Sequence, residues 1–300
     1  MAAPPTNPTS GVLLVDKPQG LTSHDVVARV RKFVGTRKVG HAGTLDPMAT
    51  GLLLLGINAS TRLLTWIVGL DKQYLATIRL GASSTTDDAE GELSARADAP
   101  AMASVADSEI AAGIASLTGR ISQRPSSVSA IKVDGKRAYT LAREGEEVVL
   151  AEREVTVSAF DLLETRRGDW IDLDVRVDCS SGTYIRALAR DLGASLGVGG
   201  HLTALRRTRI GPFGVENAVA LDEGIADSLL APAGVAAQLF PTVELTDEQA
   251  TELATGKRIA LAGQGGPIAA VAPDGRLVGL VEIVNGRAHI LVNFPQEAPR

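Results

Sequence analysis

The sequence lacks most of the features that mark secreted or membrane proteins. Its single cysteine, Cys179, excludes an internal disulfide. No stretch approaches the run of about 18 apolar residues that a membrane-spanning helix needs. Residues 1–10 contain proline but no lysine or arginine, unlike the basic start of a signal peptide. We therefore expect a cytoplasmic protein without a membrane partner, whose residues 1–10 form a flexible tail.

Motifs for the common cofactors and metals are also missing. The sequence has no phosphate-binding Walker loop, no dinucleotide-binding glycine fingerprint and no GxSxG nucleophile elbow. The four histidines show no ligand spacing, and the acidic pair Asp87 and Asp88 fits a solvated loop equally well. Cys179 lies on an alternating strand face, which favours a core residue over a nucleophile. If the protein is an enzyme, we expect it to need neither a cofactor nor a metal.

Aromatic residues are scarce, with 5 Phe, 2 Trp and 3 Tyr, so a tyrosine within a motif is more informative than usual. Tyr74, Tyr139 and Tyr184 each lie two residues from a lysine or arginine. A ring beside a cation suits a site for unstacked bases, because the ring stacks on the base and the cation meets phosphate. For each tyrosine alone, a half-buried place in the core is the competing interpretation.

The charge of the chain is unevenly distributed. The net charge of -5 argues at first against a polyanionic partner. However, residues 1–80, 121–150 and 181–215 together carry a net +10, and the remaining residues carry -15. If these three segments meet in the fold, an acidic protein can have one positive face, as nucleic-acid binding requires. The alternative is that the basic residues are scattered over solvated surfaces.

The pattern of apolar residues predicts an α+β fold. Residues 23–34 and 183–196 have helical spacing, whereas residues 73–80, 155–163 and 170–179 alternate as strands do. Helices and strands follow one another without a regular βαβ order, so we expect a mixed sheet and not a doubly wound fold. One further helix is expected over residues 102–117, and a glycine-punctuated loop over residues 36–51.

The C-terminal part of the chain has a different character. Residues 218–240 lack lysine and arginine, as a connection between domains often does. Beyond Pro241, the pairs Asp274-Gly275 and Asn285-Gly286 predict hairpin turns between short apolar runs. About sixty residues suffice for a small β-rich domain. We therefore expect a first domain over 11–240 and a second over 241–300.

Asp46 is the leading candidate for a chemical role. It lies in GHAGTLDPMATG, among glycines that allow close approach of a ligand and directly before a proline that restricts the backbone. An ordinary Asp-Pro turn is the alternative. If Asp46 is buried, desolvation raises its pKa, and the guanidinium of Arg186 beside it would offset that effect and keep the carboxylate ionised.

Six motifs in a fixed order carry a specific resemblance. They are GVLLVDKPQGLTSHDVV, GHAGTLDPMATGLLLLGI, DKQYLATIRLG, SAIKVDGKRAY, CSSGTYIRALARDLG and HLTALRRTRIGPF. From about Gly11 to Phe213 the chain resembles the bacterial tRNA pseudouridine synthase B family, which acts on uridine 55 of the tRNA T-loop. From Pro241 it resembles, more loosely, the small PUA-like RNA-binding domain of that family. One departure is Val128, where the family usually has Tyr or Phe, which puts an aromatic contact there in doubt.

The resemblance implies roles for seven residues and names tRNA as the partner, with no obligatory protein partner evident. The implied catalytic residues are Asp46, the active-site tyrosine Tyr74 and the aspartate's partner Arg186. The implied substrate-binding residues are His41, which helps to hold the opened T-loop, Tyr184 and Leu205 in the uridine pocket, and Lys17 near the site. The family breaks the bond between uracil N1 and ribose C1′, turns the base and rejoins it through C5, without cofactor or metal.

Three chemical routes are open to Asp46 after the uridine has flipped out of its stack. It could attack C1′, abstract a ribose proton towards a glycal, or add to the base. A competing hypothesis is a non-catalytic protein that binds the T-loop and assists tRNA folding, but such a protein has no use for a carboxylate close to phosphate. A glycoside hydrolase would need a second carboxylate placed as an acid, and no paired motif presents one.

Overall fold

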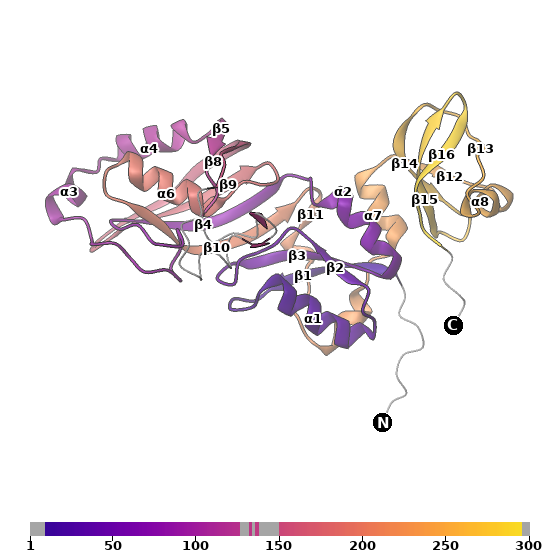
Figure 1. Cartoon of the computed structure of the whole chain (residues 1–300), viewed down its shortest axis with the longest axis horizontal. Coiled ribbons are helices and arrows are strands. Elements are labelled where there is room, and N and C mark those ends of the chain that lie inside the picture. Colours follow the sequence, from indigo (N-terminus) through magenta and orange to yellow (C-terminus); the bar gives the residue numbers. More distant parts are fainter. Residues whose placement is uncertain (1–9, 127–131, 134–135, 138–149, 296–300) are drawn as a thin grey trace.

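The computed structural model describes residues 10–126, 132–133, 136–137 and 150–295 of the chain (Figure 1). In this part of the chain, nine strands form a long mixed sheet with the order β1-β3-β10-β4-β9-β8-β5, while β2 pairs with β3 and β11 with β10. Strands β3 and β10 pair in parallel, and the other pairs of the sheet are antiparallel. The predicted α+β class with a mixed sheet is thus confirmed. The strands of this sheet are β1 (Gly11–Lys17), β2 (Val39–Ala42), β3 (Thr50–Ile57), β4 (Lys72–Leu80), β5 (Gly119–Gln123), β8 (Arg153–Arg167), β9 (Ile171–Cys179), β10 (Gly200–Ile210) and β11 (Phe213–Gly214).

Two helices lie beside the part of the sheet that holds the site. Helix α1 (Ser23–Val34) begins at a capping box in which Thr22 and Asp25 bond each other's backbone, and it ends at Gly35 in the left-handed conformation. Helix α6 (Ile185–Ser195) buries an apolar stripe against β4 and β10. The other helices are α2 (Leu64–Ile67), α3 (Ala99–Ser104), α4 (Asp107–Ser116), α7 (Pro232–Leu239) and α8 (Asp247–Ala254), with 3-10 turns η1 (Asn58–Leu63), η2 (Val215–Asn217) and η3 (Glu223–Ser228).

Two local expectations were wrong. The single helix over residues 102–117 is broken at Val105, which has an extended backbone and a buried side chain, so that α3 ends and α4 begins anew. The Glu109 carboxylate accepts a hydrogen bond from Ala106 N–H and thereby caps the start of α4. The loop over residues 36–51 contains the short strand β2, whose pairing with β3 depends on contacts distant in sequence. Edge strand β5 has no local signal strong enough to predict it.

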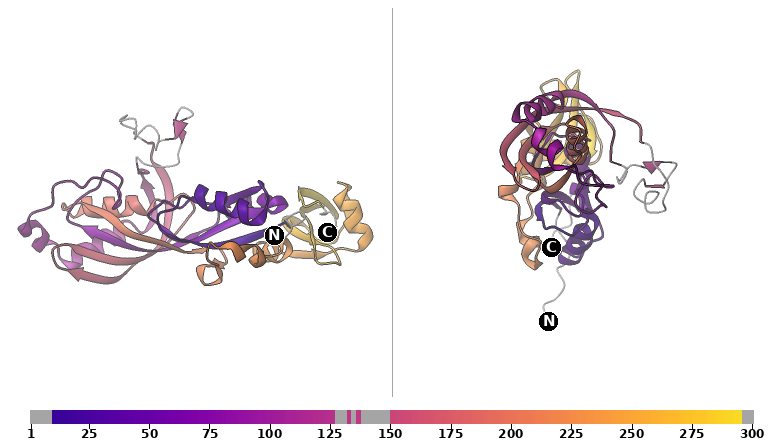
Figure 2. Two further views of the ribbon diagram at one scale, coloured as in Figure 1. Left: turned by 90° about the horizontal axis from the view of Figure 1, so that it is seen from below. Right: turned by 90° about the vertical axis from the view of Figure 1, so that its left-hand side faces the viewer.

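A second sheet lies at one end of the elongated molecule (Figure 2). Five described strands have the order β12-β14-β15-β16-β13, and both predicted hairpin turns are present. The strands are β12 (Thr242–Glu244), β13 (Ile259–Ala260), β14 (Gly265–Val271), β15 (Leu277–Val284) and β16 (Arg287–Asn293), and the two-residue strands β6 (Lys132–Val133) and β7 (Lys136–Arg137) pair separately. Leu280 and Phe294 share a buried apolar cluster with Val12, Leu14 and Val235, so the second sheet packs directly on the first part of the chain.

Among the described helices, none has both the length and the apolar character required to cross a membrane.

Candidate active site

A cavity of about 250 Å³ opens where the loop after β2, strand β4, strand β10 and the start of α6 meet. Five of the seven residues expected at the site line it: Asp46, Tyr74, Tyr184, Arg186 and Leu205. The other lining residues are Gly43, Thr44, Leu45, Lys72, Ser180, Ser181, Gly182, Thr183, Ile185 and Arg207. Segments more than one hundred residues apart in sequence therefore build one site.

Asp46 and Arg186 form an ion pair on the wall of this cavity. Nε of Arg186 lies 3.0 Å from Oδ2 of Asp46, and the Arg186 and Asp46 side chains are 5% and 35% exposed, respectively. Burial raises the pKa of Asp46 above its ordinary value, the Arg186 guanidinium acts in the opposite direction, and the nearby Asp88 raises the pKa further. The predicted pair is therefore present, and burial and the guanidinium act on the pKa of Asp46 in the expected opposite directions.

Arg186 also contacts a second carboxylate. Its Nη1 lies 3.3 Å from Oδ2 of Asp88 and donates a hydrogen bond of 2.9 Å to the carbonyl of Thr86. Of the two interpretations that the sequence left open for Asp87 and Asp88, the solvated loop is wrong, because both side chains are buried. Asp87 pairs instead with Arg190, one turn further along α6. Two adjacent acidic residues thus each meet an arginine of one helix, a pairing that cannot be read from local sequence.

Arg207 is a site residue that was not predicted from the sequence. It is almost fully buried, and its guanidinium donates to the carbonyls of Gly43 at 3.0 Å, Thr44 at 3.4 Å and Leu52 at 2.7 Å. It therefore ties the loop that carries Asp46 to strand β10. A signal was present in the sequence, since Arg207 follows Leu205 by two residues and so lies on the same face of a strand.

The glycines of the loop serve this close packing. Gly43 and Gly51 have φ angles of +85° and +98°, which residues with a side chain rarely adopt. A Cβ atom on Gly51 would lie 2.2 Å from the carbonyl oxygen of Arg207. Glycine at position 51 therefore permits the parallel pairing of β3 with β10 directly beside the site.

Tyr74 and Lys72 lie side by side in the cavity on strand β4. Burial raises the pKa of Tyr74, although the positive charge of Arg207 acts in the opposite direction, so the phenol stays neutral. Lys72 is buried, donates to the carbonyls of Val68 at 2.6 Å and Leu70 at 2.5 Å, and has its pKa lowered to about 8 by burial. An aromatic ring and a buried cation therefore share this wall of the cavity.

Tyr184 precedes the first residue of α6 and is held by its backbone. The amide of Gln123 donates to the Tyr184 carbonyl at 3.0 Å and accepts from the Tyr184 N–H at 2.8 Å. Gln123 is buried at the end of β5. This side chain therefore fixes the turn that positions both Tyr184 and, two residues later, Arg186.

Lys17 and His41 are not among the described residues that line the cavity. Lys17 is fully buried beside it and donates to the carbonyls of Leu21 at 2.6 Å, Pro18 at 3.0 Å and Pro47 at 3.4 Å; burial lowers its pKa to about 8. The ring of His41 lies 5.6 Å from that of His24, edge to face, and burial lowers its pKa. Tyr139 and Val128 lie outside the described residues.

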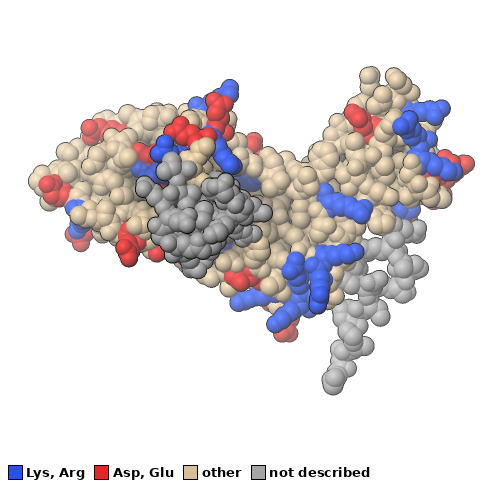
Figure 3. All heavy atoms as spheres, in the orientation of Figure 1, with Lys and Arg blue, Asp and Glu red and all other residues tan. Residues whose placement is uncertain are grey.

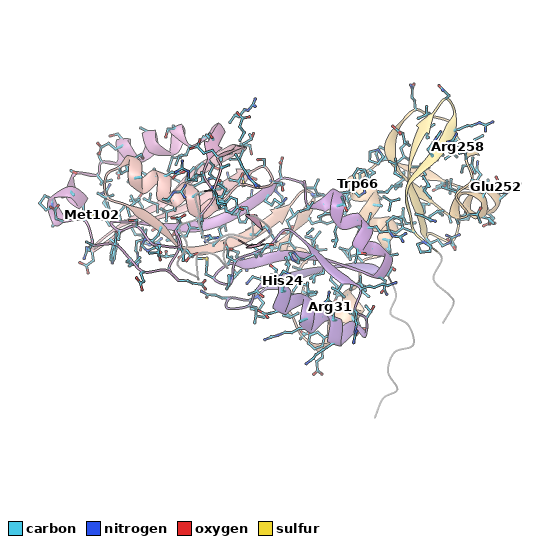
Figure 4. All side chains as sticks on the ribbon, in the orientation of Figure 1. His24, Arg31, Trp66, Met102, Glu252 and Arg258 are labelled. Atoms are coloured by element: carbon cyan, nitrogen blue, oxygen red, sulfur yellow. The ribbon has the colours of Figure 1, made fainter. Side chains whose placement is uncertain are left out.

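Residues of the basic segments 1–80 and 181–215 do meet in the described part of the chain, but much of their charge is used inside the protein. Arg186 and Arg207 are buried, while Arg206 pairs with Asp16 and Arg209 with Asp178. Exposed positive charge on the face shown in Figure 3 gathers over α1. Figure 4 shows Arg31 and His24 projecting from this helix. The exposed cations of α1 and the turn after it are Arg29, Arg31, Lys32, Arg37 and Lys38.

Comparison with known proteins identifies the family. Residues 31–185 match the TruB family pseudouridylate synthase N-terminal domain, residues 186–239 the tRNA pseudouridylate synthase B C-terminal domain, and residues 240–295 the C-terminal domain of tRNA pseudouridine synthase II. The chain belongs to the TruB family of pseudouridylate synthases. It is accordingly an enzyme, an isomerase that modifies tRNA.

Individual relatives match nearly the whole chain. The tRNA pseudouridine synthase B of Leifsonia xyli subsp. xyli is 64% identical over 96% of this chain and 97% of its own length. The protein of the same name from Thermobifida fusca is 54% identical over 95% and 98%, respectively. Among solved structures, a Cbf5-Nop10-Gar1 complex contains a chain with 26% identity and a TM-score of 0.68, covering 95% of this chain and 84% of that one. The family and the fold therefore agree over nearly the whole chain.

Proposed function

We propose that the protein converts uridine 55 of the tRNA T-loop into pseudouridine in the cavity beside Asp46. The ion pair of Asp46 with Arg186 carries the proposal, because it holds an ionisable carboxylate against a buried guanidinium on the cavity wall. The named relatives, which are tRNA pseudouridine synthases, support the substrate class. A purely RNA-binding protein would gain nothing from a carboxylate in this position.

The first step is extrusion of the uridine from its stack, which costs a few kcal/mol. The cavity offers aromatic and apolar surface that compensates for this loss, since Tyr74, Tyr184 and Leu205 all line it. His41 lies outside the lining, next to α1. Its proposed task is therefore to hold the opened loop of the RNA and not to contact the reacting uracil.

The bond exchange needs an ionised Asp46, which acts as a nucleophile or, in the glycal route, as a base. The bond from N1 to C1′ breaks, and its electron pair leaves with the uracil. The base turns, C5 bonds to C1′, the proton on C5 is lost and N1 gains one, so that substrate and product are isomers. Attack at C1′, formation of a glycal and addition to the base all fit this balance. Leu205 would help to keep the detached uracil in place, where water could otherwise reach C1′ first.

Tyr74 is suited to the final proton transfer. Because its phenol stays neutral, its hydroxyl would accept the C5 proton only while passing its own proton on, directly or through a water. The positive charge of Arg207, which acts on the Tyr74 phenol, would stabilise negative charge that develops during this relay. Tyr74 therefore combines stacking with proton transfer in the proposal.

We also propose that residues 11–240 form the catalytic domain and residues 241–300 a PUA-like RNA-binding domain. Arg258 is exposed directly before β13, and Figures 3 and 4 show positively charged groups at this end of the molecule. Cations at this end and over α1 would contact the phosphates of a substrate that spans both parts. The described tail residue Ser10 bonds Ala59 and leads directly into β1.

Base-resolved mapping of pseudouridine in tRNA after incubation with the purified protein tests the proposal. We expect one modified position, uridine 55, and we expect Asp46→Asn to abolish the modification while tRNA binding survives. Modification at another site would refute the assignment of uridine 55. Substantial turnover by Asp46→Asn would refute the role of the carboxylate.

A further inference from the structure

The first residue of α1 holds the residue that precedes Asp46. Ser23 is 1% exposed, and its hydroxyl accepts a hydrogen bond from Leu45 N–H at 2.8 Å and donates one to the Leu45 carbonyl at 3.1 Å. One side chain thus satisfies both backbone groups of Leu45, as a neighbouring strand would. We propose that Ser23 is a positioning residue that sets where the Asp46 carboxylate lies relative to Arg186 and the cavity. This inference rests on the proposed role of Asp46.

The other contacts that hold the loop are made on either side of Leu45. Arg207 holds Gly43 and Thr44 on one side, and Gly20 N–H donates to the Pro47 carbonyl at 2.8 Å on the other. Leu45 itself lies outside every strand, while its side chain is buried in the main apolar core. Without the Ser23 hydroxyl, both backbone groups of Leu45 would be deprived of these partners in a buried place. The loop would then relax just where the carboxylate is attached.

Ser23 can hold the loop because α1 is itself fixed. The Thr22 and Asp25 capping box orders the start of the helix, and Val26, Val27 and Val30 are buried in the core. The hydroxyl is therefore presented from a rigid element, which is what exact placement of a reacting group requires. Displacement of such a group by about 1 Å can lower a rate by about a hundredfold.

The effect should fall on the chemical step and not on RNA binding, because Ser23 is buried and does not line the cavity. We expect Ser23→Ala to lower the maximal single-turnover rate about 10- to 100-fold, while the half-saturating enzyme concentration stays within about twofold. In a looser ion pair, Arg186 would also counteract less of the rise that burial causes in the pKa of Asp46. The acidic limb of the rate against pH should therefore move to higher pH.

The experiment measures single-turnover pseudouridine formation on a full-length tRNA transcript over a range of enzyme concentrations and pH values. Ser60→Ala is the matched control, because Ser60 is 0% exposed and its hydroxyl has no hydrogen-bond partner among the described residues. Ser60→Ala should keep the wild-type rate and pH profile. A Ser23→Ala protein with the wild-type rate, or with an effect confined to half-saturation, would overturn the proposal.

Two further variants make the result decisive. Ser23→Cys retains the shape of the side chain but bonds more weakly, so it tests the hydrogen bonds if Ser23→Ala fails to fold. Its rate should lie at least about threefold below wild type, and an unchanged rate would overturn the proposal. Asp46→Asn is assayed in parallel. If it is inactive while the Ser23 variants are normal, the inference about Ser23 fails alone; if it is active, the proposed function of Asp46 fails.

Discussion

Replacement of Arg186 by methionine tests whether this residue keeps Asp46 ionised. Burial and Asp88 both raise the pKa of Asp46, and the Arg186 guanidinium opposes them. Removing the guanidinium should therefore raise the pKa of Asp46 further, so that the carboxylate becomes protonated at a higher pH. Because the nucleophile must be ionised, the acidic limb of the rate against pH should shift upward.

The size of the shift follows from the geometry. Two unit charges about 4 Å apart interact by about 4 kcal/mol at an effective dielectric constant of ~20. The Asp46 side chain is 35% exposed, so solvent screening weakens the interaction, and about half of that value, ~2 kcal/mol, is a reasonable figure. At about 1.4 kcal/mol per pKa unit, the acidic limb should move up by about 1.5 units.

Single-turnover rates on a tRNA transcript between pH 5 and 9 measure this shift. The matched control is Arg190→Met, because Arg190 lies one turn along the same helix and pairs with Asp87 outside the cavity. It should lose stability and keep the wild-type pH profile. Arg186→Met also leaves Asp88 without its buried partner, so the double variant with Asp88→Asn is included to restore folding. An acidic limb that stays in place in Arg186→Met would refute the reasoning. The double variant should show a smaller upward shift, because loss of the Asp88 charge lowers the pKa of Asp46.

Three further predictions concern the supports of the site and the exposed cations of α1. Gln123→Ala should lower the single-turnover rate at least about tenfold with little change in tRNA affinity, because it frees the backbone of Tyr184; an unchanged rate would contradict this. Gly51→Ala should lower the free energy of unfolding in urea by more than about 2 kcal/mol. The control Gly35→Ala should lower it by about 1 kcal/mol, because Gly35 has a φ angle of +67° but open space around it. Equal losses for the two variants would contradict the clash with Arg207. Changing Arg29, Lys32 and Lys38 to glutamine should weaken the salt dependence of tRNA binding. The slope of the log of the binding constant against log salt should fall by about 0.7 to 0.9 for each phosphate that the protein no longer neutralises. The same change at the paired residues Arg166, Arg167 and Arg176 should leave the slope unchanged.

The sequence predicted the site better than it predicted the elements around it. Asp46 and Arg186 could be paired in advance because the motifs around them resemble those of a family in which the matching aspartate and arginine are partners. Asp88 could not, since its burial depends on an ion pair with a residue nearly one hundred positions away. Strand β2 was missed for the same reason, as its four residues are held by pairing with β3. Local patterns specify local structure, whereas these features depend on tertiary contacts.

The negative net charge of the chain is compatible with an RNA substrate, because individual arginines differ in where their charge lies. The guanidinium groups of Arg186 and Arg207 are buried, where carboxylates and loop carbonyls bind them. The net charge of +10 on the motif-bearing segments is therefore larger than the positive charge that an RNA can contact. Among the described residues, exposed cations gather on α1 and the turn after it, and others, such as Arg258, lie at the end formed by the second sheet. Because few phosphates can be neutralised there, electrostatic affinity for any RNA must be limited. Selective binding must then come from the shape of the cavity and the surfaces around it, and a negative net charge helps by weakening attachment to every other RNA.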